Sequence, residues 1–108
     1  MTLDDRAVII YTSGTTGNPK GVVLTHGTLT WNALDVLADY DGTSHDRALM
    51  ISPLFHVASL GMGCLPVIMK GATVLLAERF EPAEALDSIQ RLRATMISGV
   101  PTTYQMLM

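Results

Sequence analysis

Charged side chains are scarce in this sequence. They make up 16% of the 108 residues, and hydrophobic residues make up 48%, whereas a typical soluble domain carries about 25% charged residues. A small domain that stands alone must cover its surface with polar groups. The composition therefore predicts that residues 1–108 form an incomplete piece of a larger domain. A compact apolar domain that dimerises is the alternative.

Clusters of basic residues and of cysteines are also missing. The formal net charge is −3 and the Lys and Arg residues are scattered, so we expect neither a nucleic acid nor an anionic membrane as a partner. Cys64 is the single cysteine, which excludes an internal disulfide and a cysteine-rich metal site. We expect no bound metal within the chain, and a reducing, cytoplasmic location.

Long hydrophobic runs are absent as well. The longest, residues 57–69, is too short to span a bilayer and is interrupted by Gly61, Gly63 and Pro66. The first residues, 1–5, lack the cationic and apolar regions of a secretory signal. We therefore predict a buried helix at 57–69, no transmembrane segment and no secretory signal.

Short strands alternating with helices are what the sequence does contain. Apolar runs rich in β-branched residues predict strands at 7–12, 21–24, 47–52, 72–77 and 95–98. Helical spacing and end signals, with Thr25 as an N-cap, predict helices at 26–39, 57–69, 82–93 and from 101 onward. Such alternation favours parallel crossovers, so we expect an α/β fold with a partial, mostly parallel sheet and helices on both faces.

The loop between the first two strands has the composition of a polyphosphate site. Residues 11–21 read Tyr-Thr-Ser-Gly-Thr-Thr-Gly-Asn-Pro-Lys-Gly. Glycines let backbone amides approach an anion, hydroxyls donate to phosphate oxygens, and lysine supplies the opposite charge. A Walker P-loop is excluded because Lys20 follows Pro19 and precedes Gly21. The remaining alternative is a flexible loop that only joins two strands.

Residues 11–22 resemble the signature loop of the adenylate-forming superfamily. This superfamily includes acyl-CoA synthetases, aryl-CoA ligases, luciferases and the adenylation domains of peptide synthetases. Residues 53–57 (Pro-Leu-Phe-His-Val) and 99–102 (Gly-Val-Pro-Thr) resemble two further family segments in the expected order. The resemblance implies that residues 1–108 are a fragment of the large AMP-binding N-terminal domain of an acid:CoA ligase, without the family's C-terminal domain.

The resemblance also implies roles for particular residues. Lys20 is the candidate catalytic residue. The ATP phosphates would be bound by Thr12, Ser13, Gly14, Thr15, Thr16, Gly17 and Lys20. The acyl pocket would be lined by His56, Gly99, Val100, Pro101 and Thr102. Mg-ATP, a carboxylic acid and coenzyme A would be the substrates, and the rest of the parent polypeptide would supply the adenine, ribose and magnesium contacts.

The implied reaction has two steps. A carboxylate attacks the α-phosphate of ATP to give an acyl-adenylate and pyrophosphate, and the thiol of coenzyme A then displaces AMP. The expected substrate is a fatty or similarly apolar acid, because Phe55 is followed by His56 and not by the aspartate usual in members that activate amino acids. A peptide-synthetase adenylation domain and a non-catalytic truncated remnant are the alternatives. We expect the isolated chain to be inactive and to self-associate.

A few other residues have a structural and a functional interpretation. His56 lies in an apolar setting and is either packed in the core or part of the pocket. His26 is expected to have a structural role at the start of its helix, and Cys64 to be an inert buried thiol. Core packing is the default for Trp31 and the seven methionines, with lining of a plastic acyl pocket as the alternative.

Overall fold

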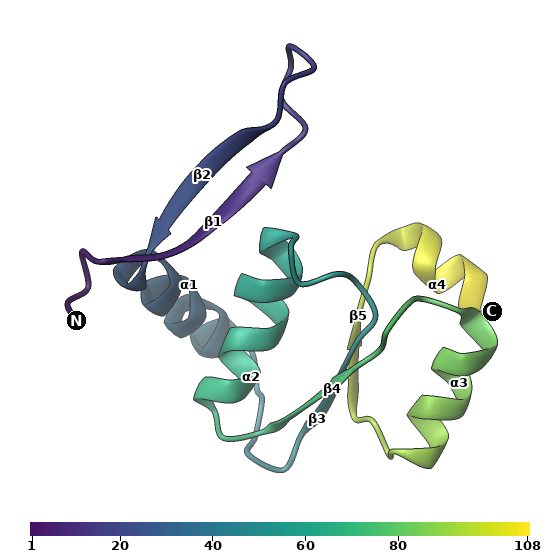
Figure 1. The fold of residues 1–108 in the computed structure, drawn as a ribbon. Coiled ribbons are helices and arrows are strands. Elements are labelled where there is room, and N and C mark those ends of the chain that lie inside the picture. The colour runs from purple at the N-terminus through teal and green to yellow at the C-terminus, as the bar shows by residue number, and fades with distance from the viewer.

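The computed structural model describes residues 1–108 as a mixed α/β fold (Figure 1). The elements in chain order are β1 (Arg6–Thr12), β2 (Lys20–Thr25), α1 (His26–Asp39), β3 (Arg47–Met50), the π-helix η1 (Ala58–Cys64), α2 (Leu65–Met69), β4 (Thr73–Leu76), α3 (Pro82–Arg91), β5 (Met96–Ser98) and α4 (Pro101–Leu107). Each predicted strand and helix is present, with small shifts at the ends.

The five strands form two separate sheets. β1 and β2 make an antiparallel hairpin, and β4, β3 and β5 make a parallel sheet in that order. The mostly parallel sheet expected from the sequence is therefore confirmed for three strands, but the first two do not join it. Residues 13–19 are too few for a parallel crossover, which needs a dozen or more residues. Figure 1 shows the hairpin projecting from the rest of the molecule.

Helices cover both faces of the parallel sheet. Alternate residues of a strand point to opposite faces, and the central strand β3 is buried on both. Ala48 and Met50 pack with Cys64 and Val67 on the side of η1 and α2. On the opposite side, Leu49 and Ile51 pack against Ala85 of α3, with Ile97 and Leu107 at the margin. The core thus consists of two thin layers that share β3.

Two helix ends are fixed by local hydrogen bonds, as the sequence predicts. The Thr25 hydroxyl caps α1 by accepting a hydrogen bond of 3.1 Å from the Thr28 backbone N–H. The end of α2 is a Schellman turn with Gly71 in the left-handed region at φ 78°. There the N–H groups of Gly71 and Ala72 donate to the carbonyls of Ile68 and Val67 at 2.9 and 3.0 Å.

The end of α3 has the same turn with a less suitable residue. Arg93 stands at the left-handed position with φ 51°, where glycine is usual. The Ala94 N–H donates to the carbonyl of Ile89 at 3.0 Å, as the Schellman pattern requires. Within α3, Ala85 is buried, whereas the next residue, Leu86, is half-exposed.

The helix predicted over residues 57–69 is present, but it is neither uniform nor fully buried. Its first part, η1, is π-helical, with Gly61 and Gly63 on the buried side. Gly61 lies close to α1, where the Asn32 side-chain amide donates a hydrogen bond of 2.8 Å to the Gly61 carbonyl. Met62 and Ile68 are exposed, contrary to the prediction of a buried helix. The side chains on that face have no covering layer among residues 1–108, so the apolar run is only half-buried.

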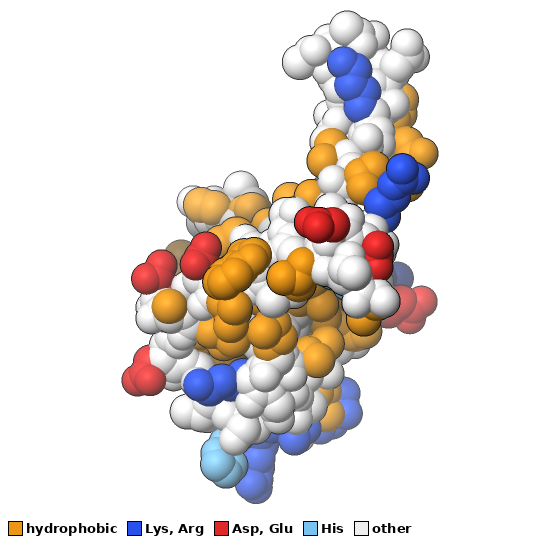
Figure 2. Space-filling model, turned by 90° about the vertical axis from the view of Figure 1, so that its left-hand side faces the viewer, with side chains coloured by type: hydrophobic (Ala, Val, Ile, Leu, Met, Phe, Trp, Pro, Cys, Tyr) orange, Lys and Arg blue, Asp and Glu red, His pale blue; other side chains and the backbone are white.

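Much apolar surface remains exposed. Only 13 of the 108 residues are buried. Large hydrophobic side chains reach solvent on α1 and α2, including Trp31, Leu34, Ile68 and Met69. Figure 2 shows hydrophobic side chains gathered on the body of the molecule below the hairpin. None of the helices combines the length and hydrophobicity needed to cross a bilayer.

Candidate functional site

The glycine- and hydroxyl-rich loop forms the tip of the hairpin. β1 and β2 pair in register from Val8–Leu24 to Thr12–Lys20, so these last two residues face each other and close the loop 13–19. Residues directly opposite in an antiparallel pair have side chains on the same face. The Thr12 hydroxyl and the Lys20 ammonium are therefore presented together at the base of the loop.

Two glycines give this loop its shape. Gly14 and Gly17 have φ of 64° and 82°, in the left-handed region that side chains disfavour. A Cβ atom on Gly14 would collide with the backbone carbonyl oxygen of Asn18, whereas a Cβ on Gly17 would meet nothing within 4 Å. Gly14 is thus required both for its backbone conformation and for the close approach of the two sides of the loop.

The polar side chains of the loop are free to meet a ligand. Ser13, Thr15, Thr16 and Lys20 are exposed, and the three ion pairs of the chain involve other residues. None of their side chains takes part in the side-chain hydrogen bonds of the chain. Hydroxyl groups, backbone N–H groups and one cation gathered at one place can bind an anion with several oxygens.

The two predicted acyl-pocket segments lie at the carboxyl edge of the parallel sheet. Residues 53–57 follow β3, and residues 99–102 follow its neighbour β5. His56 is exposed rather than packed in the core, and its ring lies 4.6 Å from the ring of Phe55, measured between centroids. In open α/β sheets, ligands bind beyond the carboxyl ends of the strands, so this edge is a suitable place for a substrate.

Two pockets lie beside η1, one at this edge and one that extends from it along β5 towards the end of α1. The first, here called the loop pocket, has a volume of about 330 Å³ and is lined by Ser52, Ala58, Ser59, Met62, Gly63, Ser98, Gly99 and Val100. The second, the strand pocket, has a volume of about 550 Å³ and is lined by Val36, Asp39, Tyr40, Met50, Met62, Gly63, Pro66, Val67, Thr95, Met96, Ile97 and Ser98.

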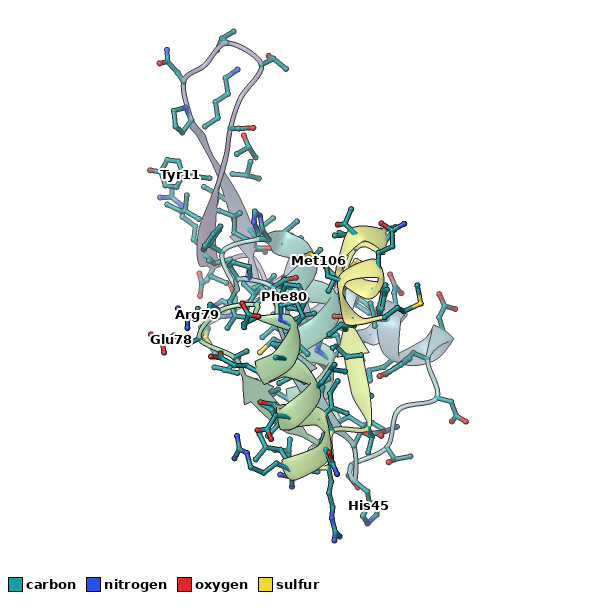
Figure 3. The ribbon with its side chains drawn as sticks, turned by 90° about the vertical axis from the view of Figure 1, so that its right-hand side faces the viewer. Tyr11, His45, Glu78, Arg79, Phe80 and Met106 are labelled. Carbon is teal, nitrogen blue, oxygen red and sulfur yellow. The ribbon has the colours of Figure 1, made fainter.

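Some of the residues singled out from the sequence meet at the loop pocket, and others do not. Gly99 and Val100 line it, whereas His56, Pro101 and Thr102 are not among its lining residues. Figure 1 shows the hairpin tip apart from α2 and β5, two of the elements whose residues line the strand pocket. Figure 3 shows Tyr11 directed outward from the hairpin and His45 at the opposite end of the molecule.

Several lining residues could not have been found by motif. Ser98 is the last residue of β5, and Ser52 follows the end of β3 by two residues. Met62 and Gly63 lie within an apolar run whose sequence predicts only a helix. The one sequence signal for the two serines is positional, since Ser98 ends β5 and Ser52 closely follows the end of β3, which pairs with β5 in the sheet.

The electrostatics of the sheet are organised at its opposite, amino edge. The backbone N–H of Thr43 and the hydroxyl of Thr95 donate to the Asp46 carboxylate at 2.6 and 2.7 Å. These bonds, the Thr43 bond first, hold the pKa of Asp46 below its usual value. Burial, and then the charge of Asp46, raise the pKa of Tyr40, whose hydroxyl donates to the Met96 sulfur.

Neither Cys64 nor any group of His, Cys, Asp and Glu side chains forms a further site. Burial raises the pKa of the Cys64 thiol, which keeps it protonated and unreactive, as expected from the sequence. No three His, Cys, Asp or Glu side chains are grouped so that they could hold a metal ion.

Comparison with known proteins places this geometry in a family. Feruloyl-CoA synthase from Amycolatopsis is 52% identical over 103 residues, which cover 95% of this chain and 21% of that protein. Indoleacetate–CoA ligase from Aromatoleum aromaticum is 40% identical over 100 residues, which cover 93% of this chain and 20% of that protein. The chain thus spans about a fifth of the length of these relatives.

A solved structure matches the fold closely. The O-succinylbenzoate coenzyme A synthetase MenE from Bacillus subtilis, in complex with ATP and magnesium ion, superposes with a TM-score of 0.88 at 40% identity, covering 99% of this chain and 22% of that one. The family of AMP-binding enzymes matches residues 1–108. The α/β fold expected from the sequence is that of these ligases, and the chain belongs to the AMP-binding enzyme family.

Proposed function

We propose that the protein containing this chain is an AMP-forming acid:CoA ligase, and that the hairpin tip binds the phosphates of its ATP. The observation that carries the proposal is the pairing of Thr12 with Lys20 at the base of an exposed loop whose glycines adopt left-handed conformations. The named relatives support it, because they are CoA ligases or synthases and a MenE structure holds ATP with magnesium.

The residues of the loop would act on the first half of the reaction. A carboxylate is a poor electrophile, and adenylation gives its carbonyl carbon a good leaving group. As the acid attacks the α-phosphate, negative charge grows on the departing pyrophosphate. The Lys20 ammonium and the hydroxyls of Thr15 and Thr16, which are all exposed at the hairpin tip, would stabilise that charge. Magnesium enters bound to the ATP phosphates, and the adenine and ribose contacts would come from outside residues 1–108.

Replacement of Lys20 tests this role. In the full-length protein, Lys20→Ala should slow acyl-adenylate formation by roughly 10²–10³-fold, or about 2.7–4 kcal/mol, as for other fixed donors to a developing charge. The second half-reaction, measured with a preformed acyl-adenylate and coenzyme A, should change much less because no pyrophosphate leaves in it. Lys70→Ala, at an exposed lysine that ends α2, is the control. Equal losses in both half-reactions would show that the loop has only a structural role.

The acid is proposed to be unaminated and to carry an aromatic ring. Phe55, Val57 and Val100 expose apolar surface at the carboxyl edge, and His56 stands where an aspartate would be needed to pair with an α-ammonium. An unpaired buried charge costs several kcal/mol. The sequence predicts a fatty or similarly apolar acid. The names of the relatives refer to feruloyl, indoleacetate and O-succinylbenzoate groups, which favour aryl acids within that class.

A panel of acids tests this assignment. Coenzyme-A-dependent AMP release by the full-length protein should be fastest with an arylpropenoic or arylacetic acid, slower with a straight-chain fatty acid of similar size, and close to background with phenylalanine. Preference for phenylalanine would favour a peptide-synthetase adenylation domain instead. Preference for the fatty acid would retain the ligase but overturn the aryl assignment.

The isolated chain is proposed to be inactive and prone to self-association. Residues 1–108 cover about a fifth of the length of the curated relatives, and their apolar surface and the free edge of β5 are open to other molecules. Pyrophosphate exchange that depends on an acid would contradict the first statement, and a monodisperse monomer would contradict the second. A cytoplasmic location for the full-length protein belongs to the same proposal.

A further inference from the structure

Gly21 interrupts the row of side chains along β2. It pairs with Tyr11 of β1, and the pairs on either side of it carry side chains on both strands. A glycine weakens the interior of a strand because it has no side chain to pack. Gly21 is not among the glycines with a positive φ, so its backbone conformation would suit any residue. The glycine is therefore explained by the space around it and not by its conformation.

The Tyr11 ring occupies part of that space. A Cβ atom on Gly21 would lie 3.0 Å from Cγ2 of Ile9 and 3.5 Å from both Cε1 and Cζ of Tyr11. These two ring atoms belong to the half of the ring farthest from the β1 backbone, so the ring reaches across the hairpin to β2. Tyr11 is otherwise 70% exposed, and Figure 3 shows it on the hairpin, away from the parallel sheet. An aromatic side chain over a glycine of the neighbouring strand stabilises the pair of strands and fixes its register.

This contact lies one residue pair from the phosphate-binding loop. Thr12 and Lys20 form the next pair, and they close the loop 13–19. No side chain among residues 12–20 takes part in a side-chain hydrogen bond or an ion pair of the chain. The orientation of the Thr12–Lys20 pair therefore depends on the backbone pairing of the strands and on the packing at Tyr11 and Gly21.

Tyr11 lies on the face of the hairpin opposite to the side chains that would bind phosphate. Successive residues of a strand point to opposite faces, so Tyr11 and Ile9 share one face, and Thr12 and Lys20 share the other. The Tyr11 hydroxyl takes part in none of the side-chain hydrogen bonds of the chain. Any effect of Tyr11 on the loop must therefore come from the packing of its ring and pass through the backbone of Gly21.

We propose that Tyr11 is a positioning residue for ATP, whose ring holds the backbone at Gly21 and thereby fixes the direction of the Lys20 ammonium and the Thr12 hydroxyl. This inference rests on the proposed function, because it assumes that the loop binds the two outer phosphates of ATP, which depart as pyrophosphate. In this role Tyr11 need not touch the nucleotide. Loss of the ring should therefore weaken the binding of ATP more than that of AMP, which lacks the outer phosphates.

Substitutions at Tyr11 in the full-length protein test the proposal. The dissociation constants of Mg-ATP and of AMP are measured by isothermal titration calorimetry without the acid, and their ratio is the readout. Tyr11→Ala should lower the preference for ATP by roughly three- to fivefold, the effect expected for the loss of one cross-strand aromatic pair. Tyr11→Phe should retain the wild-type ratio because it keeps the ring. Equal losses in the two variants would overturn the proposal, because they would assign the effect to the hydroxyl.

Gly21→Val tests the same contact from the other strand. Valine is favoured in strands, but its side chain would displace the Tyr11 ring. This variant should therefore lower the preference for ATP as Tyr11→Ala does, and it keeps the test available if Tyr11→Ala does not fold. In the presence of Gly21→Val, the further change Tyr11→Ala should have little additional effect, since the effects of residues in contact are coupled. Additive losses would contradict the proposal.

Two further variants separate the possible outcomes. Trp31→Ala removes another exposed aromatic side chain, which belongs to α1, and should leave the ratio unchanged whatever its effect on the melting temperature. The same fall in Trp31→Ala, or an unchanged ratio in Tyr11→Ala, would overturn the positioning role. Lys20→Ala tests the proposed function separately, because an unchanged ratio there would show that the loop does not bind the outer phosphates. A fall with Lys20→Ala but not with Tyr11→Ala would overturn the positioning role alone.

Discussion

The hairpin and the parallel sheet obtain their structure in different ways. In the hairpin, every β1 residue except Ala7 pairs with a β2 residue close in the sequence, and only Ile10 of these strands is buried. In the parallel sheet, β3 pairs with β4 and with β5, which lie far apart in the sequence, and Leu49 and Met50 are enclosed between helices. Local pairing therefore shapes the former, and packing over long sequence distances shapes the latter.

This difference indicates that the hairpin and the parallel sheet contribute differently to ligand binding and to the stability of the fold. The hairpin presents groups that can bind an anion but contributes little buried surface, whereas the sheet supplies the core and encloses the pockets. Substitutions in the hairpin tip should therefore weaken ATP binding more than they lower the stability of the fold. Substitutions in β3 should mainly lower the stability of the fold. The following changes test that division, beginning with the largest expected effect.

Leu49→Ala should destabilise the full-length protein by about 2–5 kcal/mol, because it removes a buried side chain and leaves a cavity in the layer beneath α3. Leu49 is 2% exposed, whereas Leu86 on the same side of the sheet is 50% exposed. Leu86→Ala is therefore the matched control and should cost much less. The measurement is the free energy of unfolding in urea. Similar losses of unfolding free energy for the two variants would mean that burial of Leu49 beneath α3 does not stabilise the parallel sheet.

Gly14→Ala should weaken ATP binding by roughly tenfold, since a left-handed alanine costs about 1–2 kcal/mol, and its Cβ would in addition collide with the Asn18 carbonyl. Gly17→Ala has the same backbone cost without the collision, so it should have the smaller effect. Titration with ATP measures both, alongside the melting temperature, which should change little. A larger effect at Gly17 would contradict the loop geometry.

Arg93→Gly should stabilise the protein by about 0.5–1 kcal/mol, because glycine adopts the left-handed conformation at the end of α3 without strain, although it loses more freedom on folding. Arg91→Gly, inside the last turn of the same helix, should be destabilising by about 1 kcal/mol. Changes of opposite sign in the free energy of unfolding would confirm that the left-handed conformation of residue 93, and not the loss of an arginine side chain, decides the effect. Urea unfolding of both variants decides the question.

The loss of folding stability at acid pH, here called the acid limb, should depend on Asp46. Its pKa is lowered in the folded state, so its contribution is present at neutral pH and is lost as the pH falls below about 4 through the folded-state value. Asp46→Asn should lower stability modestly at pH 7 and flatten the acid limb. Asp35→Asn, on the exposed face of α1, should leave the profile unchanged. An acid limb with the same slope in Asp46→Asn would show that other carboxylates dominate it.

The sequence predicted local structure well and three-dimensional relations less well. Thr25 has an unambiguous capping role, so the start of α1 was found at the right residue. The buried helix at 57–69 was wrong in part, because an apolar run does not reveal which of its sides has a partner. The two pockets could not be predicted at all, since Gly63 and Ser98 are far apart in the sequence and line the same pockets only in the folded chain. The roles of the hairpin-tip residues stay a prediction.

β2 continues directly into α1, so a change of angle at this junction would move the whole hairpin. Thr25 is at once the last residue of β2 and the N-cap of α1, and the backbone N–H groups of His26 and Gly27 are tied to the carbonyls of Asp5 and Leu3 at 3.0 and 2.7 Å. A strand as long as β1 extends for about 24 Å, so a rotation of roughly 10° at this pivot would move the tip by about 4 Å. The position of the loop is thus set by a few hydrogen bonds at the opposite end of the hairpin, because a small change of angle there becomes a large displacement at the tip.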